Sequence, residues 1–121
     1  MSFGETDPSQ SRGGGVPPAA PGNRVTFERR ELDRILNLYG RMVAAGEWRD
    51  YAIDFLKDRA VFFVFRRASE VPIYRIEKNP RLARKQGAYS VISATGLIMR
   101  RGPELDRVLR VIDKSLRVVA G

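Results

Sequence analysis

Apolar residues recur at helical spacing in two segments, one near each end of the patterned part of the chain. In residues 28–45 they follow one another at intervals of three and four, so they share one face of a helix: Leu32, Ile35, Leu36, Tyr39 and Val43. In residues 103–119 the same spacing joins Leu105, Val108, Leu109, Ile112, Leu116 and Val119. The pattern therefore predicts two amphipathic helices. Gly46 is placed to end the first, and Gly40 within it indicates either close packing or a weak point.

Between these segments the pattern changes to that of β-strands. Residues 51–55 alternate apolar and polar, while residues 61–65 are apolar at every position and indicate an inner strand covered at least partly on both faces. Residues 71–77 and 88–94 predict two more strands, and residues 97–99 extend the last one or begin a fifth. We therefore expect an α+β fold, an antiparallel meander sheet of four to five strands with an N-terminal and a C-terminal helix packed on it.

The link before the fourth strand has the residues of a short helix. Asn79 suits an N-cap, Pro80 suits the first helical position, and Gly87 suits the residue after the end. One or two helical turns are expected between them.

Domain organisation follows from where the pattern begins. Residues 1–24 hold Gly13-Gly14-Gly15 and Pro17-Pro18 with almost no large apolar groups, so we expect a disordered tail there. Residues 25–121 are expected to form a single α+β domain. The chain shows neither a leader-like N-terminus nor an apolar run of membrane-spanning length, which predicts a cytoplasmic protein with no membrane contact.

Composition removes several chemistries. The chain has no cysteine and no histidine, which excludes disulfides, thiolate catalysis and histidine-based acid–base or nucleophile systems. No glycine-rich phosphate loop or convergent carboxylate cluster is evident. Asp50 and Asp54 share one side of a strand, but ion pairing with neighbouring arginines explains them more simply than a metal does. An enzyme is therefore disfavoured, and no cofactor or metal is expected.

Charge is the remaining clue to function. The net charge is +8, and residues 66–86 hold seven basic residues against two acidic ones. The candidate anion-binding or nucleic-acid-binding residues are Arg66, Arg67, Arg75, Lys78, Arg81, Arg84 and Lys85 in this segment, with Arg107, Arg110, Lys114 and Arg117 on the last helix. Such runs serve either an anionic partner or a solvated exterior. If the fold brings segment and helix together, they would form one positive surface.

Two functions suit these features. The first is a nucleic-acid-binding or phosphate-binding accessory protein with a cationic surface, to which Trp48, Tyr74 and Tyr89 would add stacking platforms if they are not core residues. The alternative is a protein-interaction module or homodimer, using a sheet edge and the same basic patch against an acidic partner. The aromatic strand 61–65 followed by Arg66 also resembles RNA-recognition folds, without their glycine pattern or element order.

Particular stretches of sequence resemble a known family. They are residues 25–27, 30–32, 35–40, 46–54 and 74–78. Together they are similar to short alphaproteobacterial proteins grouped as domain of unknown function 2794, over residues 25–119. The resemblance implies a bacterial cytoplasmic protein with a variable N-terminal tail, and it implies no activity, cofactor or catalytic residue.

Overall fold

The computed structural model describes residues 23–67 and 71–120, with side chains described up to residue 113. In chain order the elements are α1 (Arg29–Ala44), β2 (Asp50–Phe55), β3 (Ala60–Phe65), β4 (Tyr74–Lys78), the short 3-10 helix η1 (Pro80–Leu82), β5 (Tyr89–Ser93), β6 (Ile98–Gly102) and α2 (Leu105–Ala120). The expected tail, residues 1–24, falls almost entirely outside the described residues.

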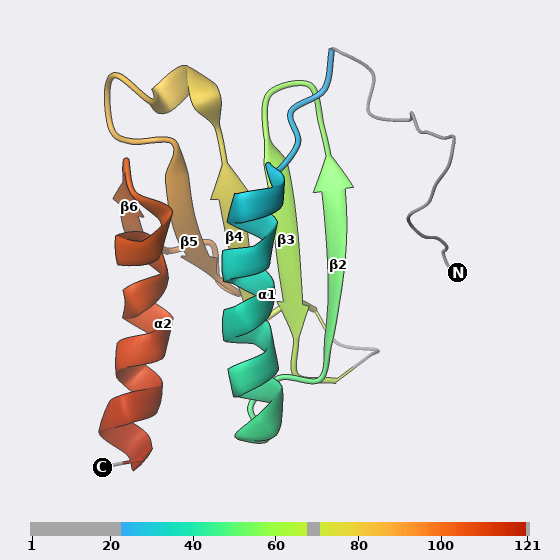
Figure 1. Cartoon of the computed structure of the whole chain (residues 1–121), viewed down its shortest axis with the longest axis vertical. Coiled ribbons are helices and arrows are strands. Elements are labelled where there is room, and N and C mark those ends of the chain that lie inside the picture. Colours follow the sequence, from blue (N-terminus) through green and yellow to red (C-terminus); the bar gives the residue numbers. More distant parts are fainter. Residues whose placement is uncertain (1–22, 68–70, 121) are drawn as a thin grey trace.

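The strands form one five-stranded sheet in the order β2-β3-β4-β5-β6, with every neighbouring pair antiparallel. This is the expected meander. Both helices lie side by side against the same face of the sheet, with α1 over the middle strands and α2 over β5 and β6 (Figure 1). The α+β prediction is confirmed, with five strands.

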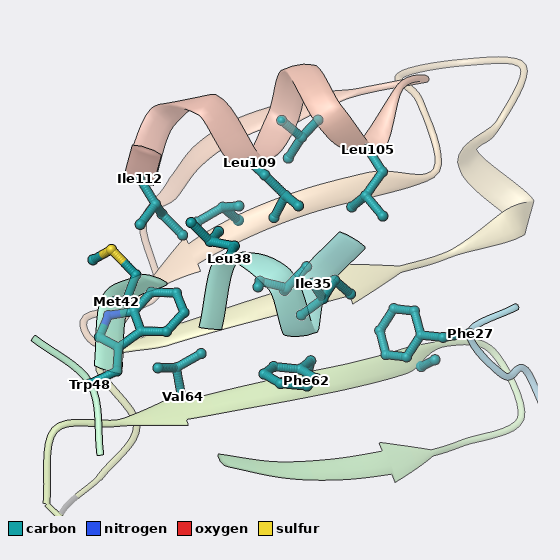
Figure 2. Close-up of a cluster of buried hydrophobic side chains, with 14 residues drawn as sticks. Phe27, Ile35, Leu38, Met42, Trp48, Phe62, Val64, Leu105, Leu109 and Ile112 are labelled. Atoms are coloured by element: carbon teal, nitrogen blue, oxygen red, sulfur yellow. The ribbon is translucent and has the colours of Figure 1, made fainter. Parts of the chain in front are cut away.

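The hydrophobic core fills the space between the helices and this face. From α1 it contains Ile35 and Leu38, which meet Phe62 of β3, and each is at most 1% exposed (Figure 2). From α2 it contains Leu109 and Ile112, also buried. The apolar faces predicted for both helices are therefore the surfaces that close the core, as the hydrophobic effect requires.

Gly40 within α1 and Gly46 just after its end have different structural roles. Gly46 has a φ of +78°, in the left-handed region, and so ends the helix as predicted. Gly40 has no heavy atom within 4 Å of the position that a Cβ would occupy. Close packing therefore does not explain Gly40, and the weak-point interpretation is the one that fits.

The link between β4 and β5 forms a single turn of helix, as the capping residues predicted. The Asn79 side chain accepts a hydrogen bond from the Arg81 backbone N–H at 3.1 Å. Gly87 has a φ of +96°, and a Cβ there would lie 2.1 Å from the carbonyl carbon of Gly102. The beginning of β5 thus passes so close to the end of β6 that only glycine fits.

Strand boundaries differ from the predictions at two places. The third strand begins at Tyr74 rather than residue 71. The apolar residues 97–99 are the beginning of a separate strand, β6, which continues through Arg101 to Gly102 and is bulged opposite Val91 and Ile92. Within the described part of the chain, no helix is long and apolar enough to cross a membrane.

Candidate functional site

The two faces of the sheet are covered differently. On β3, Phe62 and Val64 belong to the core beneath the helices, so Val61, Phe63 and Phe65 point to the opposite face. We call this opposite side the open face. From the strand registers it carries Asp50, Ala52, Asp54, Val61, Phe63, Phe65, Arg75, Glu77, Ser90, Ile92, Ile98 and Arg101. In the described residues neither helix reaches it (Figure 1).

Aromatic and aliphatic side chains occupy the middle of the open face. Val61 and Ile92 are 2% and 5% exposed although neither belongs to the core cluster beneath the helices. Phe63 and Phe65 are only half-buried, so part of each ring is accessible. The strand predicted to be covered on both faces is therefore sealed by helices on one face alone.

Arginines lie among these apolar groups. In one cross-strand row, Phe63 faces Arg75 and Arg75 faces Ile92, so the Arg75 stem lies between two apolar side chains. Glu77, also on this face, is the carboxylate that pairs with two arginines. Its carboxylate oxygens lie 3.3 Å from Arg75 Nε and 3.9 Å from Arg59 Nε.

These guanidinium groups are incompletely bonded. The Nε atoms of Arg59, Arg75 and Arg101 are buried and have no hydrogen-bond partner. The contacts of Arg59 and Arg75 with Glu77 are ion pairs that lack hydrogen-bond geometry. Yet the side chains of Arg59 and Arg75 are 42% and 36% exposed, and this exposure must fall on their other atoms. Arg101 Nη1 donates to Gln86 Oε1, which ties the open face to the 79–87 link. A ligand on this face could therefore reach the exposed parts of Arg59 and Arg75, but not the buried Nε atoms.

The basic run 66–86 does not form one patch. Arg66 and Arg67 follow the end of β3, whereas Arg81, Arg84 and Lys85 lie on the link beyond β4, at the opposite end of the sheet. The five residues of β4 separate the two groups by roughly 16 Å, at about 3.3 Å per residue. Arg75 lies between them, so the run lies at both ends of the sheet and reaches the open face at Arg75.

Lys78 is placed elsewhere. Its side chain points to the helix side, where Nζ donates to Glu31 Oε1 at 2.8 Å and to the Thr26 carbonyl oxygen at 3.0 Å. Tyr89 Oη donates to the other oxygen of Glu31, and the Glu28 backbone N–H donates to Oε1 at 2.7 Å. Lys78 therefore fixes the beginning of α1 to the sheet.

Proton affinities in this cluster follow from its contacts. Burial alone would raise the pKa of Glu31, but the hydrogen bonds from Lys78, Tyr89 and the Glu28 backbone outweigh it and hold the pKa below its ordinary value of 4.5. Burial, together with the bond to the Glu31 carboxylate, raises the pKa of Tyr89 far above its ordinary value of 10.0. The carboxylate therefore stays ionised and the phenol stays neutral near pH 7. We call this cluster of Glu31, Lys78 and Tyr89, which holds α1 on the sheet, the pin.

The basic stripe of the last helix lies on the far side of the molecule from the open face. Arg107 and Arg110 are exposed on α2, and Arg107 Nε pairs with Glu104 at 2.8 Å. Lys114 and Arg117 belong to α2, but their side chains lie outside the described residues. The described part of the stripe, Arg107 and Arg110, is therefore not part of the open face.

The three suggested stacking residues all lie on the helix side. Trp48 is 3% exposed in the core, and Tyr74 packs beside it with ring centroids 6.1 Å apart. Tyr89 holds Glu31. Asp50 and Asp54 lie on the edge strand β2, and no group of three or more acidic residues in the described part of the chain is placed to hold a metal ion.

Comparison with known families gives one result. Residues 25–109 match the model of a family described as "Protein of unknown function (DUF2794)". The chain belongs to this family. Searches of curated proteins and of solved structures find no match. Family membership covers α1, the whole sheet and the first turn of α2, and so includes the open face.

Sequence reasoning missed the open face as a site. It left Arg59 and Arg101 out of the candidates, and it considered Phe63 and Phe65 only as part of the aromatic strand 61–65 that resembles RNA-recognition folds. The signal was the alternation in the neighbouring strand, where Arg75 and Glu77 flank the buried Ile76. Two charges on one side of an inner strand indicate that this side is not sealed by a helix.

Proposed function

We propose that this protein binds single-stranded nucleic acid along the open face. The observation that carries the proposal is that Phe63 and Phe65, with accessible rings, share this face with Arg59, Arg75 and Arg101. Aromatic rings on an uncovered sheet stack with bases, and arginines contact phosphates or stack on bases in turn. A bacterial cytoplasmic location, where single-stranded RNA is available, belongs to the same proposal.

The positions of the basic residues support a nucleic-acid strand that lies along β3 and β4. Its phosphates would meet Arg66 and Arg67 at one end and Arg81, Arg84 and Lys85 at the other, about 16 Å away, a length of roughly three nucleotides. A duplex fits this surface less well, because its bases are paired and stacked and offer no free ring face to Phe63. The proposed ligand is therefore an unpaired segment.

The test measures binding of a fluorescent single-stranded oligouridine by anisotropy. Phe63→Leu keeps an apolar side chain but removes the ring, and we expect about tenfold weaker binding, since stacking contributes roughly 1–3 kcal/mol per base. Arg75→Gln is expected to weaken binding at least fivefold. Arg110→Gln is its matched control, the same change on an exposed arginine of α2, and should stay within twofold.

Salt and strandedness complete the experiment. The logarithm of the affinity should fall by about 0.7 per phosphate contact for each decade of salt, and charge reversal at Arg81, Arg84 and Lys85 should flatten that slope. Equal loss in Arg75→Gln and Arg110→Gln, or equal affinity for a duplex of mixed sequence, would show that the open face is not the binding surface.

The second candidate function is self-association through a sheet edge. One observation favours it, because β2 and β6 are the outer strands and have no further strand partner among the described residues. Asp50 and Asp54 on β2 oppose it, since two copies paired at this edge would bring like charges together. Sedimentation equilibrium separates the two, and the nucleic-acid proposal expects a monomer at micromolar concentration.

A further inference from the structure

Two adjoining hollows lie at the end of the sheet where β3 ends and β4 begins. One, of about 370 Å³, is lined by Arg66, Arg67, Val71 and Ile73. The other, of about 280 Å³, shares Arg66 and Ile73 and is lined further by Tyr74, Ser93, Thr95 and Met99. We call the pair the end hollow. Its residues come from the β3–β4 connection, the β5–β6 turn and the strand ends beside them, so a ligand there would contact β4 and both connections at once.

The two parts of the end hollow have different chemistry. The first places two guanidinium groups over the aliphatic side chains of Val71 and Ile73. The Arg66 side chain is 59% exposed, and the Glu47 carboxylate lies 3.9 Å from its Nη2. An exposed pair at that distance contributes little, so Arg66 can turn to a stronger anion at small cost.

The second part combines an apolar wall with hydroxyl groups. Ile73, Tyr74 and Met99 provide the wall, and all three pack against the core, so they are held in place. Ser93 Oγ and Thr95 Oγ1 lie 2.9 Å apart beside it. An apolar wall next to hydroxyl groups suits a flat ring with polar edges, and two arginines nearby suit an anion attached to that ring.

We propose that the end hollow binds a nucleotide carrying a phosphomonoester, with the phosphate at Arg66 and Arg67 and the base against Ile73 and Tyr74. A phosphomonoester carries a charge of about −1.5 to −2 near pH 7, which two arginines match better than a phosphodiester does. Free nucleoside monophosphates and the phosphorylated end of a strand offer this chemistry equally. The strand version rests on the proposed function, because Arg66 directly follows Phe65 of the open face.

The first arm of the test compares oligouridines that differ only at one end. Strands with a 5′-phosphate, a 3′-phosphate or two hydroxyl ends are titrated by anisotropy. At least one phosphorylated strand should bind fivefold or more tightly than the hydroxyl strand. Arg66→Gln should abolish that difference, whereas Arg110→Gln should preserve it.

The second arm uses uridine 5′-monophosphate, uridine and inorganic phosphate, followed by methyl NMR at Ile73 and Met99. Only the nucleotide should shift both methyl groups at millimolar concentration, and Arg66→Gln should weaken it about tenfold. Phe63→Leu should leave this binding unchanged while weakening the strand. Nucleotide binding without strand binding would overturn the proposed function but support the end hollow. Equal shifts from inorganic phosphate, or no shift together with no effect of a terminal phosphate, would overturn the end hollow.

Discussion

The two faces of one sheet use the same five strands for opposite purposes. On the helix side, Phe62, Ile76 and Val91 are fully buried in the hydrophobic core. On the open side the alternate residues Phe63 and Arg75 remain partly accessible, and charges lie among apolar groups. The helix side therefore holds the fold together, and the open side is available for a ligand.

This difference shows that a side chain on the sheet can be buried even where no helix lies over it. Val61 and Ile92 are buried on the open face without a helix above them. Neighbouring long side chains, Arg75 among them, lie within reach to shield them in the way that arginine stems cover apolar surface. A face shielded by side chains can be uncovered by their rotation, whereas a face sealed by helices cannot.

The largest expected effect separates two adjacent phenylalanines. Phe62→Ala removes a fully buried ring and should lower the free energy of unfolding by about 3–5 kcal/mol. Phe63→Ala removes a half-buried ring and should lower it by less than about 2 kcal/mol. Urea denaturation followed by circular dichroism measures both. Equal losses would mean that the open face is packed as tightly as the core.

Next in size is the pin between α1 and the sheet. Glu31→Gln leaves the Lys78 ammonium without its charge partner, and because their side chains are only 11% and 14% exposed, we expect a loss of about 2–3 kcal/mol. Asp106→Asn breaks the half-exposed pair with Arg34 and should cost at most about 1 kcal/mol. If both variants lose the same amount, the pin is no more than a surface ion pair.

Both acid and alkali should weaken the pin, acid by protonating Glu31 and alkali by removing the proton of Tyr89. The pKa of Glu31 is lowered in the folded state, so its stabilisation is present above 4.5 and is lost as the pH falls below that value. The pKa of Tyr89 is raised, so stability falls as the pH rises above 10.0. Each slope should reach at most about 1.4 kcal/mol per pH unit. Glu31→Gln should flatten the acid limb and Tyr89→Phe the alkaline limb, and unchanged limbs would contradict these assignments.

The smallest effect concerns glycines away from either face. Gly40→Ala should raise the stability by up to about 1 kcal/mol, because a Cβ meets nothing there and alanine favours the helix. Gly96, at a φ of +90°, is the control, and Gly96→Ala should lower the stability by about 1 kcal/mol. Thermal unfolding resolves both, and a loss in Gly40→Ala would mean that the helix packs more closely than its environment indicates.

Much of the fold could be predicted from local pattern. Helical spacing located both helices, and the capping residues Asn79 and Gly87 located the short turn between β4 and β5. The least accurate boundary was the beginning of β4, where the β-branched residues Val71 and Ile73 suggested an earlier start than the strand pairing gives.

The candidate site was harder because it depends on register. Charge counting grouped Arg75 with Lys78, although three residues along a strand place them on opposite faces, one beside Phe63 and one on Glu31. Nor could counting pair Glu31 with Tyr89, which are 58 positions apart. Such contacts are set by which strands become neighbours, and no local pattern carries that information.

The most direct test of the difference between the faces is methyl NMR of the full chain during titration with a single-stranded oligouridine. The open face offers Val61, Ile92 and Ile98 as reporters, and the helix side offers Val64, Ile76 and Val91 on the same strands. We predict shifts that saturate together in the first set, with the second set nearly unchanged. Two results would contradict the assignment of the open face. The first is a set of shifts confined to α2 or to the helix-side methyl groups. The second is the absence of shifts in the open-face methyl groups at saturating oligonucleotide.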